Sequence, residues 1–465
     1  TQYRVSAKVM CRMNYSGKHI LIIGAGTSGI GAAHVVGQLG GHAILNDYKE
    51  IELDPQVQSK LEAQGVTIIT GRQDDRLLEG IDRIIVSPGL PLTIPILESA
   101  RQKGISIVGE VELAYEVSKA PILGVTGTNG KTTTTTLLSD VMTATGQPVL
   151  VGGNIGDSLS EAALAVPADG VLVAELSSYQ LESIEHFKAH GAILLNITPD
   201  HLARHKTMDN YRLAKENIFR EQGPNDFVVL NQDDPVVYDM RHRAPSKVLC
   251  ISQKHEVTDG AYFADGTCYA VKDGQAVPVI TSSEIPIPGA HNIENILAVI
   301  ALTYALGVAV ETIHDTIRDF KAVEHRLERV DTIAGVTYYN DSKATNTDSV
   351  IKALESFDQE VILLAGGHDK MTPLEEFMME IKPHLKELVL MGEAADRFEE
   401  EAKKAGITSI HRANSMREAV EMGRKLAKEG DIVLLSPACS SFDWYSCFEE
   451  RGLDFKHEVA RLKGE

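Results

Sequence analysis

A lysine, two glycines and several hydroxyl side chains stand together in the stretch Gly127-Thr128-Asn129-Gly130-Lys131-Thr132-Thr133. The stretch follows an apolar run at 122–125 and precedes a helical pattern. Glycine lets the backbone turn its N–H groups toward phosphate oxygens, and a helix N-terminus adds partial positive charge. Lys131 is expected to reach the phosphates of a nucleotide, and Thr132 or Thr133 to ligate Mg²⁺. Because Val125 stands where the strict phosphate-loop pattern has glycine, we interpret the stretch as a variant ATP-binding loop; the alternative is an ordinary glycine turn.

A magnesium site beside such a loop needs a further ligand. The apolar run GVLVAE at 170–175 ends in Glu175, and the next run, 192–197, leads into Thr198-Pro199-Asp200-His201. Ligand groups gather at the carboxyl ends of parallel strands. Glu175 is therefore predicted to bind the metal, and His201 a metal or a phosphate. The alternatives are a surface glutamate and a structural loop histidine.

A second glycine-rich turn lies near the start of the chain. Gly24-Ala25-Gly26-Thr27-Ser28-Gly29 has the G-x-G-x-x-G spacing, and Asp47 follows 18 residues after Gly29. This pattern is typical of dinucleotide sites, but it is weak evidence when it stands alone. An NAD-dependent dehydrogenase would use it, yet that hypothesis leaves the loop at 127–133 unexplained. The two glycine-rich turns together indicate two nucleotide groups.

The elements that must position these residues alternate between strand and helix, which predicts an α/β fold with mainly parallel sheets. At roughly 150 residues per domain, 465 residues indicate about three domains. We predict a Rossmann-like domain at 1–112, a central P-loop ATPase-type α/β domain at 113–322 and a second Rossmann-like α/β domain at 323–465. Residues 1–12 are interpreted as a leader or an expression remnant. The predicted strands are 18–23, 42–46, 67–70, 83–86, 121–126, 170–175, 192–197, 336–339, 360–365, 387–391 and 432–436, with short β-like runs between 231 and 289.

The composition restricts the partners. Lys and Arg number 45 against 65 Asp and Glu, a net charge of −20, which argues against general binding to nucleic acid or to an anionic membrane. Five scattered cysteines without a C-x-x-C pair are typical of a reducing compartment, so a cytoplasmic protein is expected. The apolar runs all fall well short of the roughly 18 residues that a membrane span needs. A monomer is the expected oligomeric state.

Several further motifs accompany the loop TGTNGKTT. They are NITPDHLARH at 196–205, GAHNIEN at 289–295, EHRLE at 324–328 and NDSKATN at 340–346. With these motifs the sequence resembles the Mur ligase family, the ATP-dependent amide-forming enzymes of peptidoglycan synthesis. The resemblance extends from about residue 13 to the C-terminus. It implies an enzyme, a ligase that forms a carbon–nitrogen bond.

The stretch LLSPACSSFDWYSCFEERG at 434–452 is similar to the D-glutamate motif of one branch of that family, although Phe442 stands where an aliphatic residue is frequent. The glycine-rich first domain fits the same branch, and the D-N-P-R stretch of a diaminopimelate-adding relative is absent. The resemblance implies addition of D-glutamate to UDP-N-acetylmuramoyl-L-alanine through an acyl phosphate. The alternatives are a Mur-type ligase for another amino acid, a folate-extending relative and a nucleotide sensor without catalysis.

The resemblance also assigns roles to individual residues. It implies two Mg²⁺ ions and a carbamoylated Lys215, in a predicted helix 209–219 capped by Asp209; CO₂ reacts only with a neutral amine, so the pKa of Lys215 must be lowered. The expected catalytic residues are Lys131, Glu175, His201, Lys215 and Lys343, and the metal ligands are Thr132, Thr133, Glu175, His201 and Lys215. The expected ATP contacts are Gly127, Thr128, Asn129, Gly130, Lys131, Thr132, Thr133, Asn292, Asn295, Arg326 and Asp341, with His291 near the adenine. The expected UDP-substrate contacts are Gly26, Thr27, Ser28, Asp47, Tyr48, Ser87, Pro88, Gly89 and Asn154, and those of D-glutamate are Thr345, Lys370, Ser441, Phe442 and Phe448.

Overall fold

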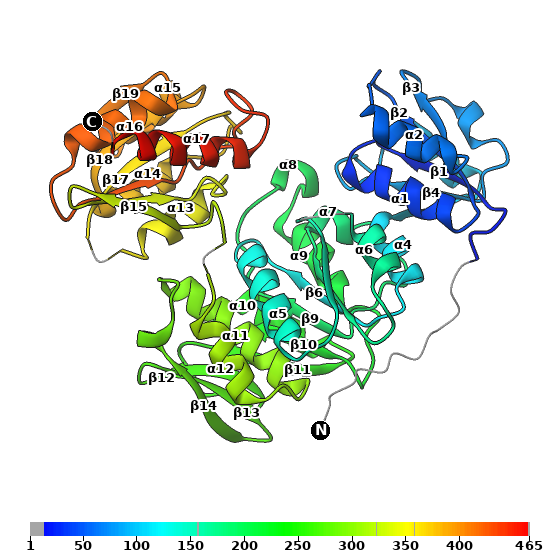
Figure 1. The fold of residues 1–465 in the computed structure, drawn as a ribbon, viewed down its shortest axis with the longest axis horizontal. Helices are drawn as coiled ribbons and strands as arrows, with labels where there is room; N and C mark the ends of the chain where they lie inside the picture. The colour runs from blue at the N-terminus through cyan, green and yellow to red at the C-terminus, as the bar shows by residue number, and fades with distance from the viewer. Residues whose placement is uncertain (1–13, 156–157, 322, 358, 464–465) are drawn as a thin grey trace. The chain divides into compact units, whose positions relative to one another are not determined.

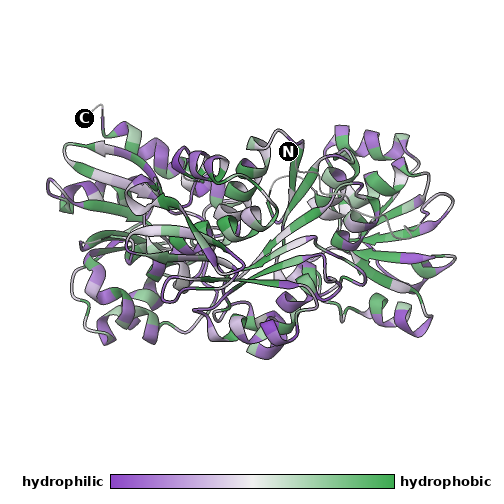
Figure 2. Cartoon of the chain, turned by 90° about the horizontal axis from the view of Figure 1, so that it is seen from below, coloured by the Kyte–Doolittle hydropathy of each residue, from purple (hydrophilic) through white to green (hydrophobic). Residues whose placement is uncertain are grey.

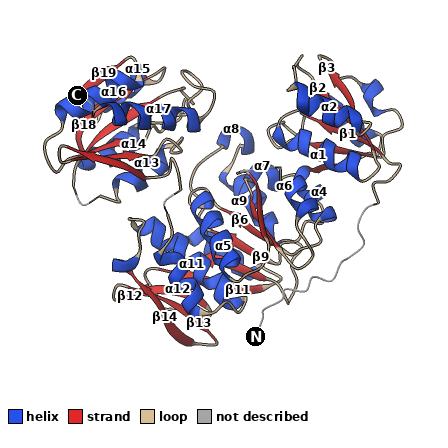
Figure 3. Cartoon of the chain, viewed as in Figure 1, coloured by secondary structure: helices blue, strands red, loops and turns tan. Residues whose placement is uncertain are grey.

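The computed structural model describes residues 14–155, 158–321, 323–357 and 359–463, so the segment 1–12 lies outside the described residues. The described residues form three sheets of five, nine and six strands. Figure 3 shows each group of strands in red with helices in blue beside it. The chain divides into two compact units, Thr1–Glu284 with Glu294–Arg318, and Ile285–Ile293 with Asp319–Glu465. None of the described helices combines the length and apolar character that crossing a membrane requires.

The first sheet has the strand order β3-β2-β1-β4-β5, and all its neighbours are parallel. The inner strands β1 and β4 are mostly buried and apolar, as expected of parallel strands covered on both faces, whereas the edge strands β3 and β5 are partly exposed. The predicted strands 67–70 and 83–86 are confirmed, whereas β5 was not predicted. The elements are β1 (His19–Ile23), α1 (Thr27–Gln38), β2 (His42–Asp47), α2 (Pro55–Ala63), β3 (Thr67–Thr70), β4 (Arg83–Val86), α3 (Pro95–Gln102), β5 (Ser106–Gly109) and α4 (Glu110–Val117).

The central sheet has the order β14-β13-β12-β11-β10-β9-β6-β8-β7. It is parallel from β7 to β12 and antiparallel from β12 to β14, so the short β-like runs of the sequence are an extension of the same sheet. Helix α5 packs against β8 and α12 (Figure 1). The strands are β6 (Ile122–Thr126), β7 (Val149–Gly153), β8 (Val171–Glu175), β9 (Gly191–Leu194), β10 (Phe227–Asn231), β11 (Lys247–Ser252), β12 (Gly260–Ala264), β13 (Thr267–Lys272) and β14 (Gln275–Thr281). The helices are α5 (Lys131–Ala144), α6 (Leu159–Ala165), α7 (Ser178–Leu181), α8 (Leu202–His205), α9 (Met208–Glu216), α10 (Pro235–Asp239), α11 (Ala290–Ala305) and α12 (Val310–Arg318).

The third sheet has the order β15-β16-β20-β17-β18-β19, parallel except for the pair β15–β16. The four strands predicted for this region are confirmed with ends shifted by one or two residues. The elements are β15 (Glu328–Ile333), β16 (Val336–Asn340), α13 (Thr347–Leu354), β17 (Val361–Gly366), α14 (Glu375–Ile381), β18 (Leu385–Met391), α15 (Ala395–Lys404), β19 (Ile410–Ala413), α16 (Met416–Leu426), β20 (Ile432–Leu435) and α17 (Phe448–Arg461). Figure 2 shows apolar strands, drawn in green, beside helices that carry many polar residues.

Helix α4 ties the first sheet to the central one inside the first unit. Glu112 accepts hydrogen bonds from the backbone N–H groups of residues 185, 186 and 187 at 2.7, 2.9 and 3.0 Å. Glu110 accepts from the hydroxyl of Ser158 at 2.6 Å and from the N–H of Ser160 at 2.9 Å. Backbone and hydroxyl donors offset the cost of burying these carboxylates, although Oε2 of Glu110 meets no hydrogen-bond partner among the described residues. These contacts fix the two sheets of the first unit to each other.

Candidate active site

The glycine-rich loop at 127–130 joins the carboxyl end of β6 to the N-terminus of α5. Gly130 is the N-cap of that helix and has φ +85°, a left-handed conformation that favours glycine. A Cβ at this position would lie 2.2 Å from Oδ1 of Asn295, so the side chain of Asn295 lies directly against the loop. The strand, turn and helix N-terminus predicted from the sequence are thus in place, and they have the arrangement that receives phosphate groups.

Asn196 clamps this loop, although the sequence assigned it no role. Its Oδ1 accepts from the N–H of Asn129 at 2.9 Å, and its Nδ2 donates to the carbonyl of Asn129 at 3.2 Å and to Oε1 of Glu294 at 3.1 Å. Its own carbonyl accepts from the N–H of Thr128 at 2.9 Å. The only sequence signal was its place in the NITPDHLARH motif directly after a strand. These contacts hold the loop in its turn.

Lys131 opens helix α5 and extends back over the loop. Its ammonium donates to the carbonyls of Gly127 and Thr128 at 3.1 and 2.8 Å. Thr132 and Thr133 follow in the first turn of the helix, where Thr133 is buried and Thr132 half-buried. Lys131, Thr132 and Thr133, which are predicted to meet phosphates and a metal, therefore all lie in the first turn of α5.

Glu175 ends strand β8, next to β6, and only 1% of it is exposed. Its Oε1 accepts from Nδ2 of Asn154 at 2.9 Å, whereas its buried Oε2 meets no hydrogen-bond partner in the part of the chain that the structure describes. An unsatisfied buried carboxylate oxygen carries a large desolvation cost unless a cation or donor meets it. The carboxylate of Glu175 and the hydroxyl groups of the loop and helix are oxygen donors, the kind of ligand that a hard divalent cation prefers. Asn154, which was predicted to meet the UDP substrate, lies against this acid.

Lys215 lies on α9, which begins after Thr207 and continues into a 3₁₀ turn, Asn217–Phe219. The predicted cap Asp209 is wrong: the helix begins at Met208, and its cap is Thr207, whose hydroxyl accepts from the N–H of Asn210. The Lys215 ammonium donates to the carbonyl of Gly127 at 2.7 Å and lies 4.8 Å from the ring centre of Tyr211. Burial, with the charge of Lys131 as a second cause, lowers the pKa of Lys215 well below its ordinary value. The predicted neutral amine is thus favoured by its surroundings.

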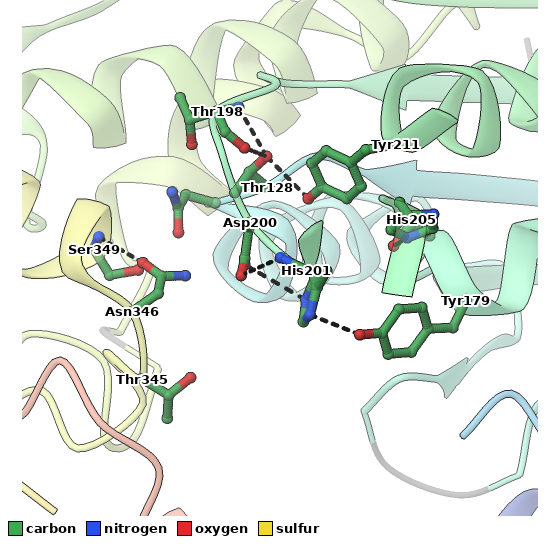
Figure 4. A network of polar contacts seen from close by, with 12 residues as sticks. Thr128, Tyr179, Thr198, Asp200, His201, His205, Tyr211, Thr345, Asn346 and Ser349 are labelled. Carbon is green, nitrogen blue, oxygen red and sulfur yellow. Dashed lines mark hydrogen bonds and ion pairs between the residues drawn. The ribbon is translucent and has the colours of Figure 1, made fainter. Parts of the chain in front are cut away.

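His201 precedes α8 in a left-handed conformation, φ +54°. Its Nδ1 lies 2.9 Å from the hydroxyl of Tyr179, and its Nε2 lies 3.5 Å from Oδ2 of Asp200 (Figure 4). With 42% of its side chain exposed, the imidazole remains accessible to a ligand. Figure 4 also shows Thr128 joined to Thr198 and to Tyr211, at 3.0 and 3.1 Å. Tyr211 links the two groups, because its hydroxyl contacts Thr128 and its ring lies 6.3 Å from that of His201.

The candidate UDP pocket occupies the carboxyl edge of the first sheet. Asp47, at the end of β2, accepts from the N–H of Ala25 at 3.0 Å and from that of Lys49 at 3.0 Å. The hydroxyl of Ser87 donates to the carbonyl of Gly24 at 3.0 Å. A Cβ at Gly29 would lie 1.8 Å from that carbonyl, so α1 can approach the turn only with glycine there. Gly26, Thr27 and Ser28 follow β1, Tyr48 follows Asp47 and is 67% exposed, and Pro88 and Gly89 follow Ser87.

In the second unit, Asp341 follows β16 in the NDSKATN motif. Its carboxylate accepts from the hydroxyl of Ser436 at 2.8 Å and from the N–H of Leu327 at 3.1 Å. Burial raises the pKa of Asp341 to about 6. His325 and Leu327 both have positive φ, +63° and +44°, so the turn that carries Arg326 is strained on both sides.

Arg451, another residue without a predicted role, joins two motifs of the second unit. Its guanidinium donates to the carbonyls of Ser342 and Cys439 at 2.8 and 3.0 Å, and to that of Ser440 at 3.2 Å. It is 2% exposed, and burial lowers its pKa to about 10. Through these hydrogen bonds Arg451 joins the NDSKATN segment to the segment at 434–441. Its place in the predicted D-glutamate motif was the signal available in the sequence.

The residues predicted to contact D-glutamate lie in and near the two segments that Arg451 joins. Lys370 donates to the carbonyl of Thr345 at 2.8 Å, and the Lys343 ammonium lies 5.1 Å from the ring of Phe448. Ser441 is buried and Phe442 is 68% exposed. Of the candidate adenine residues in this unit, Asn292 donates to the carbonyl of Pro288 at 2.6 Å, and burial lowers the pKa of His291 to about 3.

Comparison with known proteins finds matches along nearly the whole chain. The description "Mur ligase MurD-like, N-terminal domain" matches residues 18–109, "Mur ligase middle domain" matches 125–303, and "Mur ligase, glutamate ligase domain" matches 325–439. The chain is 43% identical over 453 residues to the UDP-N-acetylmuramoylalanine--D-glutamate ligase of Thermoanaerobacter sp. (strain X514), covering 97% of this chain and 100% of that one. It is 41% identical, with the same coverage, to the enzyme of that name from Clostridioides difficile (strain 630).

Solved structures share the fold at low identity. UDP-N-acetylmuramate-alanine ligase MurC from Thermotoga maritima aligns with a TM-score of 0.59 at 20% identity, covering 96% of this chain and 99% of that one. MurF from Acinetobacter baumannii aligns with a TM-score of 0.63 at 18% identity, covering 92% of this chain and 91% of that one. The predicted three-part α/β fold is thereby confirmed.

Proposed function

The chain belongs to the Mur ligase family, and we propose that it joins D-glutamate to UDP-N-acetylmuramoyl-L-alanine while ATP is converted to ADP and phosphate. The observation that carries the proposal is the match along 97% of the chain, at 41–43% identity, to enzymes named for that reaction. The geometry of the glycine-rich loop with Lys131, Glu175 and Lys215 supports it independently, because a turn with a lysine at a helix N-terminus can receive the phosphates of a nucleotide.

The reaction has to make a carboxylate reactive. A carboxylate oxygen of the L-alanyl group attacks the γ-phosphorus of ATP, and ADP leaves, which gives an acyl phosphate. The amine of D-glutamate then attacks the acyl carbon, loses a proton, and phosphate leaves. The charged oxygens crowd together in the first step, so the protein acts chiefly by positioning groups and neutralising charge.

The residues of the central sheet are proposed to hold the triphosphate. The backbone N–H groups of 127–130 and the ammonium of Lys131 would bind its oxygens. Two Mg²⁺ ions would neutralise the same oxygens when bound. Their proposed ligands are Thr132, Thr133, Glu175, His201 and carbamoylated Lys215.

Carbamoylation of Lys215 is proposed on the strength of its burial and lowered pKa. The neutral amine nitrogen attacks CO₂, loses a proton, and becomes an anionic carbamate. The modification reverses the charge that Lys215 would carry as an ammonium. An anion at this position would suit a cation site beside Glu175.

The remaining contacts are assigned as follows. The adenine would lie against Asn295, Asn292 and His291, the ribose against Asp341, and the phosphates would also meet Arg326 and Lys343. The UDP group would occupy the carboxyl edge of the first sheet. Lys370 would pair with the side-chain carboxylate of D-glutamate, beside Thr345, Ser441, Phe442 and Phe448. These assignments divide the chain into the UDP-substrate, ATP and amino-acid domains at 1–112, 113–322 and 323–465.

We also propose that the enzyme works in the cytoplasm as a monomer, without nucleic acid or membrane partners. The cysteines in the described part of the chain, Cys250, Cys268, Cys439 and Cys447, are free thiols, which supports a reducing compartment.

The test is a phosphate-release assay with ATP, Mg²⁺, UDP-N-acetylmuramoyl-L-alanine and a panel of D- and L-amino acids. We expect release with D-glutamate, and a product that is one glutamyl residue heavier by mass spectrometry. Release with L-lysine or diaminopimelate but not with D-glutamate would overturn the proposal in favour of another ligase of the family. Omission of ATP is the control and should abolish the product.

A further inference from the structure

An ion pair braces the loop that carries Lys370. The loop runs from the end of β17 to α14. Arg397, on α15, donates from Nε to Oδ2 of Asp369 at 2.8 Å and from a terminal nitrogen to Oδ1 at 2.6 Å. Its other terminal nitrogen donates to the carbonyl of Thr372 at 2.8 Å. The guanidinium thus holds the loop on both sides of Lys370, one residue before it and two residues after it.

Between these two anchors the backbone of the loop turns at Met371. Met371 has φ +55°, a strained conformation for a residue with a side chain, and its N–H donates to Oδ1 of Asp369 at 2.8 Å. The anchors keep the backbone in this turn, and from it the Lys370 ammonium reaches the carbonyl of Thr345. A bidentate guanidinium–carboxylate pair is the side-chain contact that best fixes both distance and orientation.

The ion pair between Arg397 and Asp369 also affects the charge of the loop that carries Lys370. Asp369 is adjacent to Lys370 in the sequence, and its carboxylate is only 12% exposed. An unpaired carboxylate so close to the ammonium would repel an incoming dicarboxylate. The hydrogen bonds from Arg397 lower the pKa of Asp369 and neutralise its charge toward the surroundings. Lys370 is left as the cation that a dicarboxylate would meet in this loop.

We propose that Arg397, acting through Asp369 and the carbonyl of Thr372, is the positioning residue that sets Lys370 for the side-chain carboxylate of the amino-acid substrate. This inference rests on the proposed function, because it takes D-glutamate as the amino acid. Arg397 itself does not touch the substrate. Its effect is therefore expected in the KM for the amino acid rather than in the use of ATP.

The experiment compares steady-state phosphate release in the full-length enzyme and in Arg397→Met. The KM for D-glutamate is expected to rise by on the order of 10-fold, as for a displaced binding group. The KM values for ATP and for the UDP substrate should not change, and kcat should change much less than the KM for D-glutamate. Arg397→Lys, which keeps the charge but loses the two-pronged contact, should give an intermediate KM.

The double variant Asp369→Asn with Arg397→Met removes the uncompensated carboxylate and should bind D-glutamate more tightly than Arg397→Met alone. A double variant no better than the single one would overturn the role assigned to charge. The matched control is Arg412→Met, which removes an exposed arginine paired with Asp396 and Glu399 of the same helix α15. It should leave every KM unchanged.

These measurements distinguish a failure of the proposed function from a failure of the positioning role of Arg397. If the unaltered enzyme does not use D-glutamate, the proposed function is wrong. If it does, an unchanged KM for D-glutamate in Arg397→Met, or an equal rise in Arg412→Met, would overturn the positioning role. Should Arg397→Met fail to fold, the near-isosteric Arg397→Lys carries the same test, and an unaltered KM in it would count against the proposal.

Discussion

Replacing Asp341 by asparagine is expected to stabilise the second unit of the protein at neutral pH. The carboxylate is 3% exposed, and burial raises its pKa from 3.8 to about 6. The folded state therefore holds the proton more tightly than the unfolded state, and ionisation of Asp341 opposes folding. The difference of about two pKa units, at roughly 1.4 kcal/mol each, corresponds to about 3 kcal/mol.

The sign of the pH dependence follows from the same shift. Below about pH 4 the group is protonated in both states and costs nothing. As the pH rises from 3.8 through about 6, the folded state still binds the proton that the unfolded state has released, so stability falls. Above this window the loss is complete. Asparagine stays neutral throughout, so its advantage should grow over the same window and reach about 3 kcal/mol near pH 7.

The chain offers a convenient probe for the measurement. Its single tryptophan, Trp444, belongs to the second unit, so urea unfolding followed by tryptophan fluorescence reports on the unit that contains Asp341. The two proteins would be compared at several pH values across the window, with Asp396→Asn as the control because that carboxylate is 97% exposed. A difference independent of pH, or an asparagine variant less stable near pH 7, would refute the reasoning. Asp341→Asn should also bind ATP less well, since the carboxylate of Asp341 is proposed to meet the ribose.

Three further substitutions test other parts of the site. Lys215→Ala should lose most ligase activity in phosphate-release assays, with partial rescue by small carboxylates; full activity would contradict the carbamate proposal. Asn196→Ala removes the two hydrogen bonds to the backbone of Asn129, and ATP titration should show an affinity on the order of 10-fold lower; unchanged affinity would exclude a role in shaping the loop. Gly452→Ala would place a Cβ 2.2 Å from Nδ1 of His325, and a lower Tm corresponding to about 1–3 kcal/mol is expected; an unchanged Tm would show that the contact relaxes freely.

Much of the fold could be predicted from the sequence because parallel strands buried on both faces are unbroken apolar runs. β4 and β17 are of this kind and were found within a residue of their ends. β5, β15 and β19 are edge strands of their sheets and carry exposed or polar residues, so none of them presents a buried apolar run. The hairpins from β12 to β14 depend on pairing with one another, and local pattern alone could not join them to the central sheet.

The candidate site divides in the same way. Lys131 and Glu175 were predictable because each stands at the end of its own element, where a short motif marks it. Asn196, Arg397 and Arg451 contact backbone groups that are 67, 25 and 109 residues away in the chain, and Arg397 also pairs with a carboxylate 28 residues away. No local pattern encodes such contacts, because the partner atoms are carbonyls and N–H groups that every residue carries. The network that supports the motif residues therefore became visible only in the folded chain.

Lys215 and Arg451 show how burial acts on two basic side chains in a chain whose net charge is −20. Among the described residues, neither Lys215 nor Arg451 has a carboxylate within ion-pair distance; backbone carbonyls hold both. Burial acts on both but with opposite consequences. Lysine can release its proton, so Lys215 tends toward the neutral amine that CO₂ requires. Arginine does not release its proton at neutral pH, so Arg451 keeps its positive charge beside the NDSKATN segment. This charge would attract the anionic ligands that the segment is proposed to bind. Whether a buried basic residue of this chain keeps its positive charge thus depends on which side chain the fold buries.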